Sequence, residues 1–398
     1  MRPLSRDPVV IVGAARTPIG SLQGEFRDVT AAQLGSTAIM AALSRAGLAP
    51  DQVDEVVLGC VLSAGQGQAP ARQAALGAGL PLSAGATTVN KMCGSGMKAA
   101  MIAHDALLAG SAGIVVAGGM ESMSNAPYLV DRARGGYRMG HGRLLDHMFL
   151  DGLEDAYDRG RLMGSFAEDC AEAYDLTRAA QDAFAAASIT KARKAMAEGA
   201  FAAEVAPVTV RTGQGNHVVA ADEQPPKARL EKIPALKPAF RDGGTVTAAN
   251  SSSISDGAAA LVLMRRSEAD RRNLAPLATI VSHSTHAQAP GLFTTAPTGA
   301  IRKLAERTGW RLEEVDLFEI NEAFAVVPMA AIRDLSLPED KVNPHGGACA
   351  LGHPIGASGA RVMVTLLSAL RRYGLRRGMA SLCIGGGEAT AIAIDIAT

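Results

Sequence analysis

The chain has 398 residues, 48 % of them hydrophobic and 43 of them glycine, and its 39 Lys plus Arg balance 39 Asp plus Glu. This length suits two domains or one large duplicated domain, and 4 % aromatic residues with abundant glycine are typical of a compact α/β protein. The balanced charge excludes a long-range field that would gather nucleic acid or an anionic membrane, so an anionic ligand must be held by local contacts.

The cysteines and the chain ends bear on the compartment. No two cysteines form a CxxC pair, so we expect free thiols in a reducing environment at Cys60, Cys93, Cys170, Cys349 and Cys383. The first apolar run, residues 9–15, is short and leads into Arg16-Thr17-Pro18, which favours a strand over a signal peptide. No uncharged stretch has the length of a membrane span, and the last residues lack a peroxisomal or ER-retention ending. We therefore expect a cytoplasmic protein.

Strands and helices alternate at the start of the chain. Short β-branched runs at 8–12 and 55–59 alternate with Ala- and Leu-rich helical segments at 31–46 and 70–79, which favours a mostly parallel sheet. From about residue 123 to 249 the pattern is irregular, with one long charged helix at 177–199 and a Pro-rich stretch at 224–238. This middle part is predicted to be an insertion that lies over the sheet.

Two distant segments repeat one another. In the first, Cys93-Gly94-Ser95-Gly96 opens a predicted helix to residue 108, and a strand at 113–117 ends in Gly118-Gly119-Met120-Glu121. In the second, Gly356-Ala357-Ser358-Gly359 opens a helix to residue 373, and a strand at 379–384 ends in Gly385-Gly386-Gly387-Glu388. The chain therefore looks internally duplicated, and two related halves would bring both glycine runs to one site.

Cys93 is the first candidate for chemistry. It lies where a predicted strand at 87–91 gives way to a helix, so the positive end of the helix dipole favours a thiolate there. The alternative is a buried cysteine that acts as a small hydrophobic side chain. The Gly-Ser-Gly that follows favours the nucleophile.

The second copy supplies possible partners for this thiol. His353 lies just before the equivalent helix, so the internal symmetry brings it near Cys93, where a neutral imidazole could take the thiol proton. Cys383 ends the final glycine-flanked strand, where α/β sheets commonly present reactive groups. A turn histidine and a core cysteine are the alternative interpretations.

The sequence evidence for other kinds of site is weaker than that for the two thiols and the histidine. Asn321 follows a predicted strand at 317–320 and could hold a water or a substrate oxygen, although a helix N-cap explains it equally well. No Cys, His or Glu pair has metal-ligand spacing, so no metal site is predicted. A dinucleotide site is also disfavoured, because Gly94-Ser95-Gly96 lacks the downstream glycine and follows a cysteine.

Four sequence blocks together closely resemble the signature blocks of the thiolase family: Val89-Asn90-Lys91-Met92-Cys93-Gly94-Ser95-Gly96, Asn321-Glu322-Ala323-Phe324, Gly352-His353-Pro354-Ile355-Gly356 and Cys383-Ile384-Gly385-Gly386-Gly387. Supporting stretches are spread over essentially the whole chain: Arg16-Thr17-Pro18, Gly118-Gly119-Met120-Glu121-Ser122-Met123-Ser124 and Thr245-Val246-Thr247-Ala248-Ala249-Asn250. The resemblance implies an α/β thiolase fold, in which duplicated βαβαβαββ halves pack as a five-layer α-β-α-β-α sandwich with an inserted loop domain. It places an N-terminal half at 1–122 plus 250–274, a loop domain over the acyl-CoA site at 123–249 and a C-terminal half at 275–398.

The resemblance also implies an activity: reversible Claisen condensation of two acetyl-CoA to acetoacetyl-CoA plus CoA. His353 would deprotonate Cys93, which would carry the acyl group, and Cys383 would take the α-proton of a second acetyl-CoA. His353 and a water on Asn321 would serve the enolate, and the backbone N–H groups of Cys93 and Gly385 the tetrahedral intermediate. A side chain at Gly385 would obstruct the acyl oxygen.

The resemblance further assigns Ser252 to the pantetheine arm and Met163 to the acyl pocket, with loop and packing roles as the alternatives. CoA thioesters would be substrates, with no cofactor and no metal, and the assembly would be a homodimer or homotetramer. Leu162 replaces a histidine that is common in biosynthetic relatives, which is expected to alter CoA affinity, and Phe293 is expected to reshape the acyl pocket. A short acyl chain and a role in fatty acid metabolism are the preferred interpretation.

Alternatives remain open from the sequence. A degradative 3-ketoacyl-CoA thiolase of broader chain length would use the same residues. A 3-oxoacyl-carrier-protein synthase is disfavoured, because its second catalytic block has no counterpart in this sequence. A non-catalytic acyl-CoA binding protein is disfavoured because a binder needs no paired thiols.

Overall fold

A computed structural model describes residues 7–213 and 215–396. The main strands form one sheet in the order β12-β13-β14-β11-β1-β10-β5-β3-β4, and a short β2 pairs with β10. The strands of the N-terminal part are β1 (Val9–Arg16), β2 (Gly20–Ser21), β3 (Glu55–Gly59), β4 (Gly85–Val89), β5 (Ile114–Ser122) and β10 (Ser255–Arg265). Those of the C-terminal part are β11 (Ala278–Ala287), β12 (Leu317–Ile320), β13 (Arg377–Ile384) and β14 (Glu388–Ile396).

The sheet consists of two related halves. In the first, β3 runs parallel to β4 and β5, and β10 runs antiparallel to β5 and β1. In the second, β12 runs parallel to β13, and β14 runs antiparallel to β13 and β11. The counterpart of β4 is only an isolated parallel bridge between Phe318 and Val342. The halves join where Val10 and Ile11 pair with Thr279 and Ala278. The predicted duplication is confirmed. The prediction of a mostly parallel sheet is wrong, because β10, β11 and β14 pair with their neighbours antiparallel and, among the strands of the described chain, only β3, β4, β5, β12 and β13 take part in parallel pairs.

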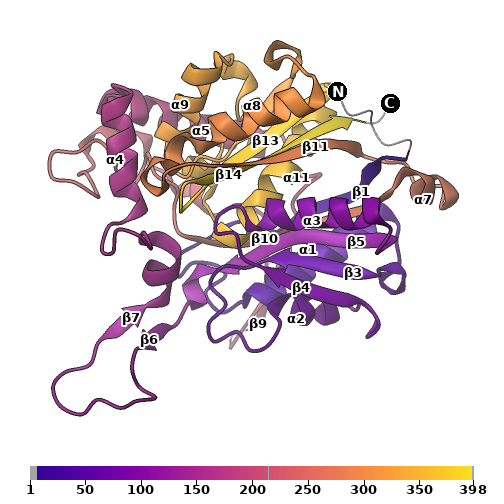
Figure 1. The fold of residues 1–398 in the computed structure, drawn as a ribbon, viewed down its shortest axis with the longest axis horizontal. Coiled ribbons are helices and arrows are strands. Elements are labelled where there is room, and N and C mark those ends of the chain that lie inside the picture. Colours follow the sequence, from indigo (N-terminus) through magenta and orange to yellow (C-terminus); the bar gives the residue numbers. More distant parts are fainter. Residues whose placement is uncertain (1–6, 214, 397–398) are drawn as a thin grey trace.

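Helices form three layers around the two half-sheets (Figure 1). Helices α1 (Ala31–Ala46) and α2 (Pro70–Gly77) cover the outer face of the first half, and α8 (Ala296–Thr308) and α9 (Val326–Leu335) cover that of the second. Helices α3 (Ser95–Ala109) and α11 (Ile355–Tyr373) lie between the half-sheets in a shared apolar core. The five-layer α-β-α-β-α arrangement is therefore confirmed. It explains why nearly every residue of α11 from Ile355 to Leu370 is buried, since both sides of the helix are covered.

Glycines allow the two central helices to touch at their starts. A Cβ added at Gly96 of α3 would lie 2.8 Å from the backbone nitrogen of Ala360, and one at Gly359 of α11 would clash with the backbone of Met97. A Cβ at Gly119, within β5, would likewise clash with the carbonyl of Gly356. The absence of side chains here brings the starts of α3 and α11 together.

Residues between β5 and β10 leave the sheet. They form a hairpin of β6 (Tyr128–Val130) and β7 (Leu144–Asp146), which projects from the body in Figure 1, then α4 (Met163–Ala173), α5 (Arg178–Ala197), a second hairpin of β8 (Val208–Thr212) and β9 (Gly215–Val219), and α6 (Gln224–Lys227). The buried Arg16 of β1 ties this region to the sheet through Glu204 at 2.6 Å and Asp222 at 2.7 Å. The predicted domain boundaries stay a prediction, and residues 1–6 and 397–398 within them lie outside the described chain.

The remaining elements are short. They are the helices α7 (Arg266–Arg271) and α10 (Ala348–Leu351), a π-helix at Phe149–Leu153, and 3₁₀ helices at Pro50–Gln52, Met123–Asn125, Leu230–Ala235, Pro290–Thr295, Leu312–Glu314 and Glu339–Lys341. Among residues 7–213 and 215–396, no helix combines the length and apolarity that crossing a bilayer requires.

Candidate active site

Cys93 lies on a sharp turn between β4 and α3. The strand ends at Val89, Met92 has a φ of 47°, and α3 begins at Ser95 with Gly94 as its N-cap. A non-glycine residue in the left-handed region costs about 1–3 kcal/mol, and such strain is concentrated at functional turns. The side chain of Cys93 is only half-buried. The turn therefore places the thiol of Cys93 just before the first residue of α3 and not along the helix.

Two backbone N–H groups point at the sulfur of Cys93. They belong to Gly385 and to Cys93 itself, and both favour the thiolate. Burial acts more strongly in the opposite direction and raises the pKa of Cys93 to about 11. Desolvation of the sulfur thus outweighs both the N–H groups and the helix start, which favour the thiolate, so Cys93 rests as a thiol.

Cys383 lies beside Cys93 at the end of β13. Its side chain is 1 % exposed, and burial, with the nearby Cys93 sulfur, raises its pKa well above the ordinary thiol value. Met163, the first residue of α4, approaches the same place: a Cβ on Gly385 would lie 3.4 Å from its sulfur. The structure thus brings together Cys93, Cys383, Gly385 and Met163.

His353 lies in the loop before α11 and is 6 % exposed. Its Nδ1 lies 2.6 Å from the hydroxyl of Ser358, and that hydroxyl donates its own proton to the carbonyl of Pro354 at 2.9 Å. Ser358 can therefore only accept from His353, so the imidazole proton is on Nδ1. Burial and the nearby Arg361 lower the pKa of His353 to about 3. The ring is neutral, and its Nε2 has no partner in the described part of the chain.

The loop of His353 reaches the Cys93 turn. Ile355 packs in one apolar cluster with Met92 and Cys93. Gly356, the next residue, donates its N–H to the buried carboxylate of Glu121 at 2.8 Å. Sequence reasoning did not assign Glu121 a role. It also accepts from the N–H groups of Val61 and Leu62, so it fixes the loop after β3 to the start of α11.

Asn321 directly follows β12 and is 1 % exposed. Its Oδ1 accepts a hydrogen bond from Nη2 of Arg361 at 3.1 Å, and its Nδ2 has no partner within the described residues. The N-cap interpretation of Asn321 is wrong, because α9 begins only at Val326. A buried amide N–H₂ that is left free is a donor available to a water or a ligand.

A cross-half ion pair flanks the site and was also missed. Lys91, in the turn that carries Cys93, pairs with Glu388, which follows the C-terminal glycine run. Both side chains are partly exposed. The pair ties the turn of Cys93 to the strand pair that carries Cys383.

The other predicted residues lie around this centre. Ser252 is half-buried, and its N–H bonds the carbonyl of Ala323 at 2.9 Å, so it lies beside the Asn321 loop. Phe293 is 3 % exposed and packs edge-to-face against Phe166, with 6.2 Å between ring centroids. Phe293 therefore belongs to the core that supports Cys383 and Met163. Leu162 precedes α4 and is half-buried.

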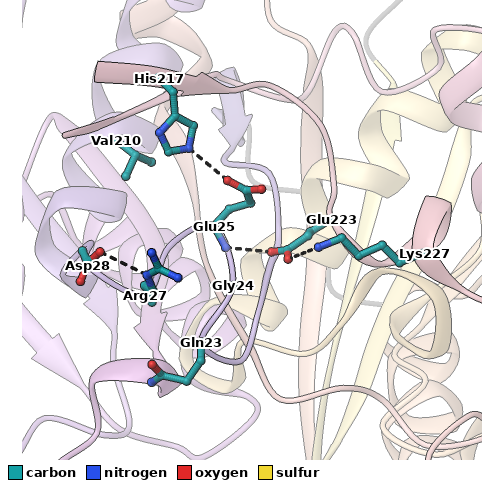
Figure 2. Close-up of a pocket in the computed structure, with 9 residues that line it drawn as sticks. All are labelled: Gln23, Gly24, Glu25, Arg27, Asp28, Val210, His217, Glu223 and Lys227. Atoms are coloured by element: carbon teal, nitrogen blue, oxygen red, sulfur yellow. Dashed lines mark hydrogen bonds and ion pairs between the residues drawn. The ribbon is translucent and has the colours of Figure 1, made fainter. Parts of the chain in front are cut away.

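A surface cavity of about 350 Å³ lies away from these residues, between the turn at 23–28, the β8–β9 hairpin and α6 (Figure 2). Its charged groups already pair with one another, as in His217 with Glu25 at 3.0 Å and Lys227 with Glu223 at 2.6 Å. Elsewhere, His104, Asp105 and His283 form a group with possible metal-ligand spacing. Asp105 accepts from both rings, and His104 lies about 14 Å along α3 from Ser95.

The fold and this centre define a class: duplicated α/β proteins with a cysteine at the start of a central helix and a second thiol from the other half. The chain belongs to the thiolase family. Residues 9–267 match the family model "Thiolase, N-terminal domain", and residues 274–396 match "Thiolase, C-terminal domain".

Similar proteins span the same length. An acetyl-CoA acetyltransferase of Cupriavidus necator is 47 % identical over 97 % of this chain and 99 % of its own. The crystal structure of the Bacillus anthracis acetyl-CoA acetyltransferase superposes with a TM-score of 0.96 at 41 % identity, over 98 % of this chain and 99 % of that one. The Acat5 thiolase from Ascaris suum in complex with coenzyme A gives 0.92 at 42 % identity, over 98 % of this chain and 100 % of that one.

Proposed function

We propose that this protein is an acetyl-CoA acetyltransferase, which condenses two acetyl-CoA to acetoacetyl-CoA plus CoA and also runs in reverse. The observation that carries the proposal is the buried imidazole of His353, whose proton is fixed on Nδ1 by Ser358, so that Nε2 is a free acceptor in the loop that packs against Cys93. The names of the full-length relatives support acetyl-CoA as the substrate.

The first half-reaction acylates Cys93. Nε2 of His353 takes the thiol proton, and the sulfur attacks the thioester carbonyl of acetyl-CoA. The N–H groups of Cys93 and Gly385, which already point at the sulfur, stabilise the oxyanion. Collapse breaks the bond to the CoA sulfur, which leaves with the proton of Cys383. The enzyme then carries acetyl-Cys93, imidazolium at His353 and thiolate at Cys383.

The second half-reaction forms the carbon–carbon bond. The Cys383 thiolate is a strong base because burial raises its pKa, and it takes the α-proton of the second acetyl-CoA. The His353 imidazolium and a water on Nδ2 of Asn321 hold the enolate oxygen. The enolate carbon attacks acetyl-Cys93, acetoacetyl-CoA leaves, and the Cys93 thiolate regains its proton from His353. All protons are then in their starting places, without a metal or another cofactor.

Ser252 and Met163 complete the proposed substrate site. The half-buried hydroxyl of Ser252 lies beside the Asn321 loop and is assigned to the pantetheine arm of CoA. The thioether of Met163 lies over Gly385 and is assigned to the acyl group. The Ascaris suum thiolase, a relative in complex with coenzyme A, supports CoA as a ligand.

Two alternatives make different predictions. A degradative thiolase of broader chain length would prefer substrates of eight or more acyl carbons, so a chain-length series separates it from the acetyltransferase. A non-catalytic binding protein would hold acyl-CoA without releasing CoA. The four groups Cys93, His353, Cys383 and Asn321 favour catalysis over binding alone.

The direct test is incubation with acetyl-CoA, followed by intact mass and peptide mapping. We expect CoA release and an acetyl group on Cys93 of the wild-type protein, and neither in Cys93→Ala. A wild-type protein that releases no CoA and carries no acetyl group would show that the proposed function is wrong.

We further propose a cytoplasmic homodimer or homotetramer that acts in fatty acid metabolism. The β6–β7 hairpin carries exposed apolar side chains, with Tyr128 at 64 %, Leu144 at 70 % and Met139, in its connecting loop, at 96 % exposure. Strand β4 ends the sheet order and leaves one edge open. Light scattering tests the assembly: a monomeric wild-type protein would contradict it, and Met139→Asp with Leu144→Asp should reduce a tetramer to dimers.

A further inference from the structure

The side-chain amide of Asn321 can occupy its place in two orientations. As it stands, Oδ1 faces Arg361 and accepts its Nη2–H at 3.1 Å, while Nδ2 faces away from the guanidinium, without a partner in the described parts of the chain. A flipped amide would place its N–H₂ group against another donor, since arginine only donates. Arg361 therefore selects the orientation in which the N–H₂ end is free.

Arg361 has a second partner, the carboxyl group of Glu319 on β12. Its Nη1 lies 3.6 Å from Oε2 of Glu319, and both side chains are almost fully buried, at 2 % and 1 %. Glu319 and Asn321 are two residues apart, so their side chains leave β12 and its continuation on the same side. The guanidinium spans both of them. Burial lowers the pKa of Arg361, but a guanidinium stays charged in proteins. Burial also raises the pKa of Glu319 to about 8, and the charge of Arg361 acts against that rise.

One helix, α11, carries the two residues that orient the buried side chains of His353 and Asn321. Ser358 and Arg361 are three residues apart on α11, so they lie on one face of the helix. Ser358 fixes the tautomer of His353, and Arg361 fixes the amide of Asn321. In addition to burial, the positive charge of Arg361 lowers the pKa of His353.

We infer that Arg361 is a positioning residue, which orients Asn321 so that its N–H₂ end faces the reacting groups. It thereby supports the enolate half of the reaction and not the acylation of Cys93. This inference rests on the proposed function, because it assigns Asn321 to the enolate step.

The test separates the two half-reactions. Arg361→Met is combined with Glu319→Gln, so that no buried carboxylate is left unpaired, and Glu319→Gln alone is the control. Acylation is followed by CoA release and by the mass of the acetyl-enzyme, and condensation by acetoacetyl-CoA formation. We expect acylation within about 3-fold of the control, and condensation slower by about 10- to 100-fold, which is the loss of one buried hydrogen bond in the transition state.

A double-mutant cycle gives the second readout. Asn321→Ala alone should slow condensation to a similar extent, and adding it to the Arg361→Met, Glu319→Gln protein should cost little more, because both changes remove the same oriented amide. If the combined variant does not fold, Arg361→Lys provides the test, because it keeps the positive charge but loses the planar guanidinium group. Acylation should again be retained and condensation slowed, but by a smaller factor.

Equal slowing of acylation and condensation would overturn the inference. It would also be overturned if the condensation losses caused by the Arg361 and Asn321 changes multiplied in the combined variant. These outcomes differ from failure of the proposed function, in which the wild-type protein itself forms no acetyl-enzyme.

Discussion

Replacement of Ser358 by alanine tests the tautomer of His353. Within the described residues, the hydroxyl of Ser358 makes two hydrogen bonds, one from Nδ1 of His353 at 2.6 Å and one to the carbonyl of Pro354 at 2.9 Å. That carbonyl also accepts the N–H groups of Ala357 and Ser358, both at 2.9 Å, so it keeps its partners in the variant. The change therefore leaves one buried group, Nδ1 of His353, without a partner.

The size of the effect follows from that single loss. A buried donor without a partner costs about 1–3 kcal/mol, which in a transition state is a factor of about 5 to 150 in rate. The imidazole can also place its proton on Nε2, where it no longer accepts the thiol proton. We expect Ser358→Ala to lower kcat/KM for both condensation and thiolysis within this range, and to slow acylation of Cys93 as well.

A matched control is available in Ser284. It is also fully buried, and its hydroxyl donates to the carbonyl of Ala300 at 2.7 Å in the outer layer of the second half. Ser284→Ala should lose similar stability in chemical denaturation but keep its acylation rate. If Ser284→Ala slowed acylation as much as Ser358→Ala, or if Ser358→Ala acylated at the wild-type rate, the tautomer argument would be refuted.

Further variants and conditions test the rest of the site and the fold. Cys383→Ser should still become acetylated but condense poorly, and loss of acylation would show that its role is different. Because burial raises the pKa of Cys93 to about 11, its alkylation rate should rise about tenfold per pH unit through pH 8–10, and a plateau below pH 9 would contradict this. Arg16→Met leaves buried carboxylates unpaired and should lower the free energy of unfolding by at least about 3 kcal/mol, against about 0–1 for the exposed Arg27→Met, as measured by denaturation. Dialysis against EDTA should leave condensation unchanged, and a rate restored only by added metal would argue against a metal-free mechanism.

The duplicated α/β architecture could be predicted, because it follows from local sequence patterns and from their repetition along the chain. The paired glycine segments at 93–96 and 356–359 are sufficient to predict the duplication, since each opens a helix that leads into a glycine-ended strand. Strands such as 55–59 and 317–320 matched their predicted limits, since short β-branched runs between polar turns leave few alternatives. In the second half, the counterpart of β4 is a single isolated β-bridge at Val342, and no local sequence pattern predicts that it is so short.

Supporting residues such as Arg361 and Glu121 could not be predicted, because their partners are distant in sequence. Arg361 stands as the only charge between Ile355 and Leu370 of α11, which is a signal of a buried charge, but its partner Glu319 can be found only from the packing of α11 on β12. The raised pKa of Cys93 was missed for a related reason. The helix start is visible in the sequence, whereas the desolvation that outweighs it depends on what covers the sulfur.

The contact of α3 with α11 limits how this fold can be recombined. Gly96 and Gly359 leave no space for side chains between the helices, and each helix belongs to a different half of the chain. A chimera joined between β10 and β11, with the second half taken from a distant relative, would need a glycine at both positions. Even an alanine at one of them would push apart the turns that hold Cys93 and His353. Two halves of this fold can therefore be exchanged only if both keep a glycine at the contact.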